Sequence, residues 1–310
     1  MARIFVEGWS PTYGTPLDTA ELAPAEGSVD ETVEHERWSP LPGSDDGVEV
    51  IAFVDGVRRV DARLTIDDPL GPVPGLCGTF AVGAVRWDRA AVRSVVADEH
   101  VERWAILAGG RAEIFPPVDL QPPYETLPVA DRDGDTLLWA LQTRMRAAEG
   151  ALAADLSAEA FVLADGPLNE LGRHQLVGVV KSHRVTYLSP ERTPVVSALA
   201  VGQRTPLFAI KDFGRYSWYV RLGDVPDGHA WSGVVRCEAS VHLSLDEVRT
   251  IADRTAALLP LVASAPHLAP RAPQNLVPIG ALERALRHRM GDPGLVYRAL
   301  RAAVAERRAS

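Results

Sequence analysis

The stretch that decides the fold is Val48-Glu-Val-Ile-Ala-Phe-Val54, which is followed at once by Asp55-Gly56. Its apolar, partly β-branched side chains are typical of a buried strand, and the alternating residues 57–64 predict a second strand, antiparallel to the first. A third strand is expected between Leu76 and Trp87. We therefore expect a three-stranded meander, with Asp55-Gly56 at the end of its first strand.

A long amphipathic helix is predicted over residues 136–152, where Leu138, Leu141 and Met145 recur at helical spacing behind an acidic cap. A short apolar run, Ala160-Phe-Val-Leu-Ala164, follows and ends in a second Asp-Gly pair, Asp165-Gly166. Three strands, a helix and a strand are the opening of a ribonuclease H-like core. The expected fold class is therefore α/β, with a mixed central sheet.

The rest of the chain predicts further strands and helices around this core. Strands are expected over 176–181, 207–210, 218–222 and 232–242, then a helix over 246–259 and two short helices after Pro278. We expect one main domain over 47–290 with additions at both ends. These are an N-terminal arm over 1–46, rich in Pro, Gly, Ser, Asp and Glu, and a basic C-terminal helix over 291–310. Residues 88–133, broken by two Pro-Pro pairs, are interpreted as an insertion.

Composition limits the classes of function. The chain has 310 residues, is 46% hydrophobic and has no apolar stretch of membrane-spanning length, so we expect a soluble cytoplasmic protein without a membrane segment. A net charge of -9 argues against non-specific coating of nucleic acid, so any site for DNA must be local. Cys77 and Cys237 lack the spacing of a zinc site. No phosphate-binding glycine loop is present, so ATP would be used only by a partner.

Asp55 and Asp165 each come directly after an apolar run and before a glycine. A carboxylate at the end of a central strand projects at the rim of the sheet. Asp-Gly is also the signature of a type I′ hairpin turn, and this alternative stays open for Asp55. It explains Asp165 less well, because Pro167-Leu-Asn-Glu-Leu-Gly172 does not resume a strand.

Glu149 is the third candidate acid. It lies about 20° from Leu138 around the predicted helix, on the apolar face, where a carboxylate is costly unless a cation or hydrogen bonds compensate it. Mn²⁺ or Mg²⁺ shared with Asp55 and Asp165 would do this, and three such carboxylates suit phosphodiester hydrolysis. The alternative is that Glu149 reaches solvent or pairs with Arg146.

Several ordered motifs resemble those of the NurA nucleases. They are Phe53-Val-Asp-Gly56, Val162-Leu-Ala-Asp-Gly-Pro-Leu168, Gly178-Val-Val-Lys-Ser182, Trp218-Tyr-Val-Arg-Leu222 and Val235-Arg-Cys-Glu238. The resemblance implies a ribonuclease H-like fold, Mn²⁺-dependent exo- and endonuclease cleavage of DNA of 5'-3' type, a homodimer, and a HerA-like hexameric ATPase as partner in DNA-end processing. It also places Asp55, Glu149 and Asp165 where the metal-binding acids of the family lie.

The chain departs from the family pattern at three places. Val57 and Pro167 take positions where the family commonly has serine, and the C-terminal stretch around Pro273 offers no acid. Asn275, through its carbonyl, or Glu283 is the candidate replacement as metal ligand. The alternative function is a catalytically inactive NurA-like partner that threads DNA or assembles with the ATPase.

Four basic residues are candidates for contacting DNA. They are Lys181, Arg184, Arg221 and Arg236. The resemblance places a lysine at 181, whereas a basic cluster alone is more often a solvated face. Arginines within strands need an anionic partner, which for Arg236 is either DNA phosphate or Glu238.

Overall fold

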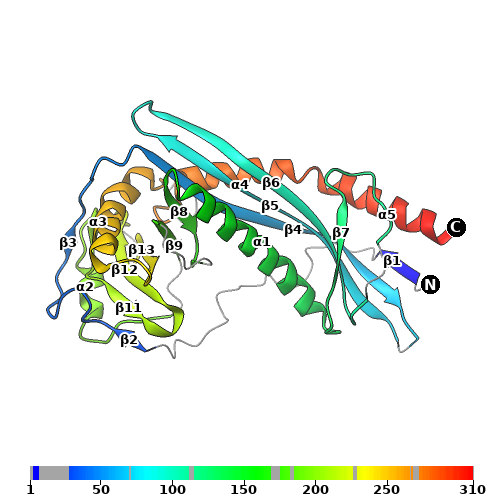
Figure 1. Ribbon diagram of the computed structural model, residues 1–310, viewed down its shortest axis with the longest axis horizontal. Coiled ribbons are helices and arrows are strands. Elements are labelled where there is room, and N and C mark those ends of the chain that lie inside the picture. The colour runs from blue at the N-terminus through cyan, green and yellow to red at the C-terminus, as the bar shows by residue number, and fades with distance from the viewer. Residues whose placement is uncertain are drawn as a thin grey trace.

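The centre of the fold is a mixed β-sheet organised around the long strand β4 (Val50–Asp67) (Figure 1). The computed structural model describes residues 3–6, 28–69, 71–111, 115–168, 175–181, 185–225, 229–265, 267 and 272–309. On one side of β4, β5 (Val73–Asp88) pairs with it antiparallel, and β6 (Arg93–Leu107) pairs antiparallel with β5. These three strands form an extended ribbon that gives the molecule its elongated shape.

The other side of β4 carries two parallel strands. β8 (Phe161–Asp165) pairs parallel with β4, and β9 (Leu176–Val180) pairs parallel with β8. Helix α1 (Gly134–Leu156) precedes β8 in the chain. The spatial order β6-β5-β4-β8-β9, antiparallel on one side of β4 and parallel on the other, is that of a ribonuclease H-like core.

Beyond β9 the sheet continues as an antiparallel region. The next strands are β13 (Val234–Ser240), β12 (Arg215–Arg221), β11 (Phe208–Ile210) and the short β2 (Val29–Asp30). The remaining short elements are β1 (Arg3–Val6), β3 (Leu41–Pro42), β7 (Tyr124–Pro128), β10 (Gln203–Arg204), α2 (Thr193–Ser197) and the 3-10 turn η2 (Lys211–Phe213).

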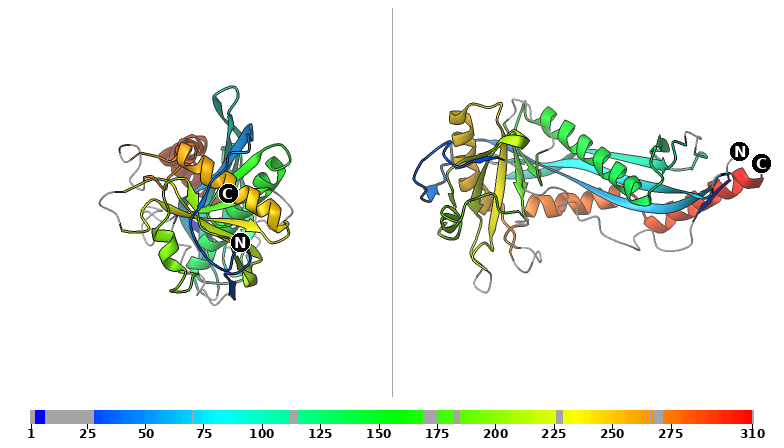
Figure 2. Two further views of the ribbon diagram at one scale, coloured as in Figure 1. Left: turned by 90° about the vertical axis from the view of Figure 1, so that its left-hand side faces the viewer. Right: turned by 90° about the horizontal axis from the view of Figure 1, so that it is seen from below.

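Helices cover both faces of the β4–β5–β6 ribbon. Figure 2 shows α1 on one face and, on the opposite face, α4 (Val277–Arg289) and α5 (Pro293–Ala309). Helix α3 (Leu245–Val262) packs in the same hydrophobic core as α4. Among the described residues, no helix is both long enough and apolar enough to cross a membrane.

Successive side chains of β4 point to these two faces in turn. Phe53 and Val57 lie in the core shared with α3 and α4, whereas Ala52 and Val54 lie in the core shared with α1. This alternation follows from the period of two in a strand. It decides on which face each acid of the site lies.

The predicted break at Asp55-Gly56 is wrong: residues 48–54 and 57–64 do not form two strands. They belong to β4, which pairs with β5 without interruption through Asp55↔Gly83 and Gly56↔Val82. The strand continues because the ladder with β5 satisfies the backbone on both sides of the pair, so no turn forms. The antiparallel partner is instead β5, and the predicted third strand corresponds to it.

The interpretation of residues 88–133 as an insertion is also wrong. β6 lies within this range and pairs with β5 from Arg93 to Leu107, so it is an integral strand of the core. The first half of β6 lies outside the hydrophobic core and is mostly exposed, so its sequence lacks the apolar pattern that predicts a strand. The other predicted strands and the helices over 136–152 and 246–259 are confirmed, with boundaries shifted by a few residues.

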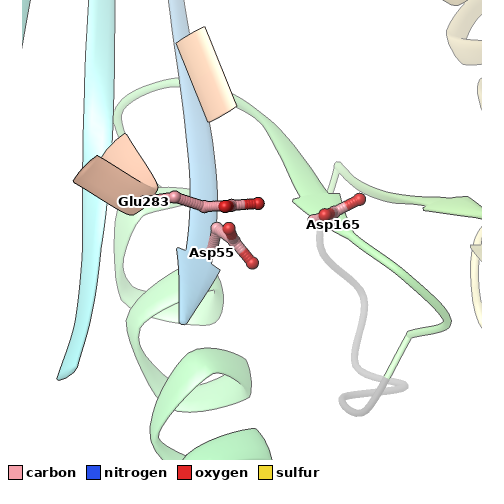
Figure 3. Close-up of side chains that lie close together, drawn as sticks. All are labelled: Asp55, Asp165 and Glu283. Carbon is pink, nitrogen blue, oxygen red and sulfur yellow. The ribbon is translucent and has the colours of Figure 1, made fainter. Parts of the chain in front are cut away.

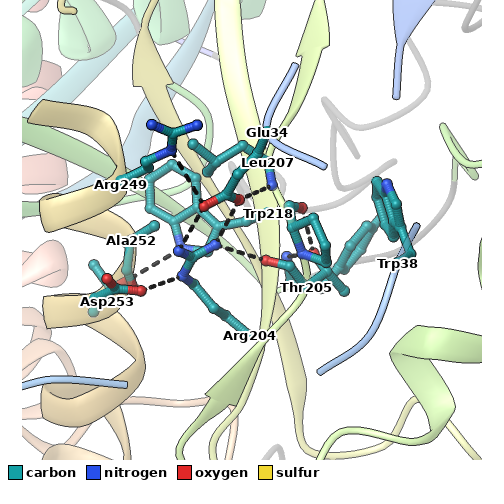
Figure 4. Close-up of polar contacts among 12 residues, drawn as sticks. Glu34, Trp38, Arg204, Thr205, Leu207, Trp218, Arg249, Ala252 and Asp253 are labelled. Atoms are coloured by element: carbon teal, nitrogen blue, oxygen red, sulfur yellow. Dashed lines mark hydrogen bonds and ion pairs between the residues drawn. The ribbon is translucent and has the colours of Figure 1, made fainter. Parts of the chain in front are cut away.

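A buried ion pair joins the segment 28–46 to the main body (Figure 4). Glu34 accepts hydrogen bonds from Nη1 and Nη2 of Arg204 at 2.9 and 3.0 Å and from the backbone N–H of Leu207 at 2.7 Å. Arg204 also donates to Asp253 of α3 at 2.6 Å. Although burial raises the pKa of Glu34, the hydrogen bonds and charge of Arg204 outweigh it, and the pKa lies below its ordinary value. The described part of the N-terminal arm is therefore fixed.

Candidate active site

Asp55 and Asp165 meet where β8 ends beside β4. Val54 of β4 pairs with Ala164 of β8, so the two aspartates are the next residues on neighbouring strands. β8 stops at Asp165, and Gly166, with a φ of 89°, takes the chain out of the strand. β4 continues past this point, paired on its other side with β5. The carboxyl ends of parallel strands leave a crevice of the kind in which α/β proteins bind their ligands.

Glu283 of α4 completes a group of three acids with these aspartates. One carboxylate oxygen each of Asp55, Asp165 and Glu283 lies within 4.8 Å of the other two. Figure 3 shows the three side chains pointing toward one another from β4, β8 and α4. The neighbouring Leu282 and Leu286 are fully buried and hold this face of α4 on the sheet. Glu283 itself is half-buried and pairs with Arg287 on the same helix at 2.9 Å.

Glu149 approaches the crevice from the opposite face of β4. It is buried on α1, and its carboxylate accepts a hydrogen bond from the backbone N–H of Gly56. Glu149 and Asp165 line one small pocket, together with apolar residues such as Val54 and Leu176. Glu149 does not emerge to solvent. It also stands outside the group of three acids, because odd and even side chains of β4 point to different faces.

Burial and neighbouring acids raise the pKa values of Asp55 and Glu149. Burial, and then the charges of Asp165 and Glu149, raise the pKa of Asp55 well above its ordinary value, and Lys181 only partly opposes this. Burial raises the pKa of Glu149 to about 7; the charge of Arg146 opposes the rise and that of Asp165 adds to it. Negative charge is therefore in excess in the crevice, a condition that a bound cation would relieve.

Of the residues expected to contact DNA, Lys181 lies at the acids. Its Nζ donates to Oδ2 of Asp165 at 2.8 Å, directly after β9 ends. Arg184 lies outside the described residues. Arg221 is buried and donates to four backbone carbonyls, those of Ser197, Leu199, Ala230 and Ser232.

Arg236 is also occupied within the protein. It is buried, donates to Glu238 and Ser217, and lies over the ring of Tyr187 at 4.7 Å. Glu238 accepts in addition from Arg215 at 2.8 Å. This is the internal pairing that the sequence left open against a DNA contact.

The two candidates for the C-terminal ligand occupy different places. The backbone carbonyl of Asn275 accepts a hydrogen bond from Ser264 at 2.8 Å, beside a bridge between Ala263 and Leu276. Glu283, by contrast, lies in the acidic group. A sequence signal for it existed: Ile279, Leu282 and Leu286 form the apolar stripe of α4, and Glu283 borders that stripe.

The titration of Glu149 has a consequence for stability. The pKa of Glu149 is about 7 in the folded chain, against an ordinary value of 4.5. The protonated side chain therefore contributes to the unfolding free energy fully below pH 4.5, and this contribution is lost as the pH rises through 7. At 1.36 kcal/mol per unit, the metal-free protein loses about 3 kcal/mol of unfolding free energy over this range. Glu149→Gln is expected to flatten that part of the curve, measured by urea unfolding in chelator between pH 4.5 and 8. The exposed Glu159→Gln is the control, and an unchanged slope in Glu149→Gln contradicts the prediction.

Glycine at position 56 allows the carboxylate of Glu149 to pack against the backbone of β4; it does not form a turn. A methyl group at this position would overlap the carboxylate of Glu149. Gly56→Ala is therefore expected to cost about 1–3 kcal/mol of unfolding free energy, through overpacking and loss of the hydrogen bond to Glu149. Gly134→Ala, where nothing lies within 4 Å of the new atom, is the matched control for thermal unfolding. Equal melting temperatures of the two variants would refute this role.

The similarity of this chain to solved structures is distant. A search of solved structures finds the NurA nuclease from Sulfolobus solfataricus at 12% identity, covering 71% of this chain and 76% of that one with a TM-score of 0.41. It also finds the catalytic domain of human endonuclease V at 16% identity, covering 79% of this chain and 83% of that one with a TM-score of 0.32. No protein-family model and no curated protein matches the chain. The sequence motifs resemble the same NurA family, and the strand order carries the fold assignment.

Proposed function

We propose that this protein is a metal-dependent nuclease that hydrolyses phosphodiester bonds of DNA. The observation that carries the proposal is the group of three carboxylates, Asp55, Asp165 and Glu283, with oxygens within 4.8 Å of one another where β8 ends beside β4. The ordered NurA-like motifs of the sequence support DNA as the substrate. We assign Asp55, Asp165 and Glu283 as ligands of Mn²⁺ or Mg²⁺, with Glu149 close by on the α1 side.

The chemistry of these residues fits such an ion. All of them offer hard carboxylate oxygens, which Mn²⁺ and Mg²⁺ prefer, and no sulfur or imidazole ligand lies among them. The raised pKa values of Asp55 and Glu149 follow from burial and from mutual repulsion. A divalent cation would offset both, and the buried acids are held ready for it by the strands and by the amide of Gly56.

The protein's own groups divide the remaining work. A bound divalent ion polarises a phosphate oxygen and lowers the pKa of a bound water. Lys181, 2.8 Å from Asp165, places a positive charge beside the acids, where the phosphate would lie. Glu149 accepts a hydrogen bond from the backbone N–H of Gly56, which holds its carboxyl group on the α1 side of β4, behind Asp55. No side-chain nucleophile is needed for this reaction.

Metal binding is expected to stabilise the fold. Mn²⁺ at 100 times its Kd adds about 2.7 kcal/mol to the unfolding free energy, which raises the melting temperature of a chain of this size by several degrees. The same titration on Glu283→Gln should give a smaller rise, because one ligand is lost. Arg289, which pairs with Glu99 away from the acids, offers a control in Glu99→Gln. A Mn²⁺ response that Glu283→Gln leaves intact would remove Glu283 from the ligand set.

The function itself is tested by cleavage of end-labelled single-stranded and duplex oligonucleotides in Mn²⁺. The proposal includes a 5'-3' exonuclease activity together with endonuclease cleavage, and the labelled end that shortens first reports the polarity. Products from the unmodified protein, absent in chelator, support the nuclease. Absence of products under every metal condition would favour the alternative, a catalytically inactive protein that threads DNA or assembles with an ATPase.

The proposed setting is DNA-end processing in the cytoplasm, as a homodimer with a HerA-like hexameric ATPase. Its support is the resemblance of the sequence motifs to NurA and the lack of an ATP-binding loop in this chain. Sedimentation of the purified protein tests the dimer. ATP-stimulated cleavage in the presence of such an ATPase tests the partnership.

A further inference from the structure

Arg146 lies at the edge of the acidic crevice. It is half-buried on α1, three residues before Glu149, and so lies on the same side of the helix. A Cβ atom built on Gly166 would lie 3.9 Å from Nη1 of Arg146, which places the guanidinium beside the residue that follows Asp165. Its charge also lowers the pKa of Glu149 against the effect of burial. Two observations thus place one cation near both acids.

Several buried or half-buried arginines of the sheet already have partners within the protein. Arg236 and Arg215 share Glu238, and Arg221 donates to backbone carbonyls. Arg58 donates to Gln142. Arg146, in contrast, donates no hydrogen bond to any residue that the structure describes. A half-buried guanidinium with its donors unused beside a hydrolytic crevice suits an anionic ligand.

Phosphate is the anion that fits this place. The planar guanidinium can donate two parallel hydrogen bonds to non-bridging phosphate oxygens, which a compact ammonium cannot do. Lys181 reaches Asp165 from the end of β9, whereas Arg146 reaches Gly166 from α1. The two cations therefore come to the Asp165-Gly166 turn from different elements, as a clamp around one phosphate requires.

We propose that Arg146 is a phosphate-binding residue that, together with Lys181, holds the phosphodiester of the substrate at the acids. This inference rests on the proposed nuclease function for its substrate class. A purely internal role, in which Arg146 only neutralises Glu149, makes a different prediction, because that role acts through the acids and the metal and not through the phosphate.

The test compares Arg146→Gln and Arg146→Lys with the unmodified protein. Arg249→Gln is the control. Arg249 lies on α3, where it pairs with Asp246 of the same helix and with Glu34 of the segment 28–46 (Figure 4 shows the pair with Glu34), and its loss changes the net charge equally. Three quantities are measured: kcat/KM for a single-stranded oligonucleotide in Mn²⁺, the Kd of Mn²⁺ by calorimetry without DNA, and the salt dependence of oligonucleotide binding.

The expected result is a loss of about 100-fold in kcat/KM for Arg146→Gln, with about a tenfold recovery in Arg146→Lys. The Kd of Mn²⁺ should be unchanged or tighter, because a competing positive charge is gone. The slope of log affinity against log salt should fall by about 0.7, as for one lost contact to a single strand. Arg249→Gln should leave kcat/KM and Mn²⁺ binding unchanged.

Two results would overturn the inference while leaving the nuclease intact. One is a kcat/KM of Arg146→Gln that equals that of the unmodified protein. The other is a loss of Mn²⁺ affinity in Arg146→Gln that accounts for the whole loss of activity. Arg146 would then act only by neutralising the acids. If the unmodified protein cleaves no DNA, the nuclease proposal fails, and the salt slope then decides alone: a reduced slope retains Arg146 as a phosphate contact, and an unchanged slope rejects it.

Discussion

Asn in place of Asp55 or Asp165 is expected to lower Mn²⁺-dependent DNA cleavage by about a thousandfold, and Asp55→Asn is also expected to make the metal-free protein more stable. Each change removes a carboxylate from the group that also contains Glu283 and so removes a ligand of the catalytic ion. For Asp55 it also removes a buried charge whose pKa is raised by burial and by neighbouring acids. In Asp55→Asn, activity and stability should therefore change in opposite directions.

Cleavage rates and melting temperatures in chelator, measured on the same preparations, check this prediction. Asp246→Asn is the matched control, because Asp246 is exposed at the start of α3 and pairs only with Arg249 among the contacts described. Cleavage at the unmodified rate in both Asn variants would reject the site. If Asp55→Asn melts at a lower temperature than the unmodified protein, the predicted gain in stability is wrong. If a variant shows no melting transition, its loss of activity reflects a failure to fold.

Loss of Glu34 is expected to destabilise the protein by about 3–5 kcal/mol of unfolding free energy. Glu34→Gln removes the charge that faces Arg204, and both side chains are only 3% exposed. Asp253 remains as a partner of Arg204, but it is one-third exposed and contacts a different nitrogen. A guanidinium left without its main counter-charge in the interior cannot recover its hydration.

Urea unfolding followed by tryptophan fluorescence measures this loss, since Trp38 and Trp218 both lie near the ion pair (Figure 4). Proteolysis within residues 28–46 should also accelerate, because Glu34 fixes this segment to β10 and to the start of β11. Asp246→Asn breaks the exposed pair with Arg249 and should change stability by less than about 1 kcal/mol. If both variants lose the same amount, burial is not what makes the Glu34 pair matter.

The sequence predicted the core because apolar periodicity reports burial directly. The runs at β4 and β8, the helix α1 between them and the later strands all carry that signal. It failed for β6, whose first half leaves the core and presents polar side chains to solvent. It failed at Asp55-Gly56 for another reason. The dipeptide Asp-Gly is compatible both with a turn and with a strand in which another side chain packs against the glycine. Only the position of Glu149, which the sequence does not give, distinguishes the two cases.

The site was predictable in part. The ends of β4 and β8 could be placed together from their parallel order, so the convergence of Asp55 and Asp165 follows from topology. The sequence could not show on which face of the sheet each glutamate lies, because this depends on how α1 and α4 pack against β4. That packing puts Glu149 on the α1 face and Glu283 in the group with the aspartates. Which acids bind metal stays a prediction.

The origin of Glu283 on α4 has a consequence for how the protein is made. The two aspartates belong to strands that can pair early, whereas Glu283 arrives on a helix near the end of the chain. That helix is fixed at its C-terminal end by Arg59 and Arg103, which donate to the backbone carbonyl of Met290. A chain still being synthesised therefore holds only an incomplete set of acids. We therefore expect the three acids to come together only once α4 has docked on the sheet, so a nascent chain should bind a divalent ion at this place only after residue 283 has been added.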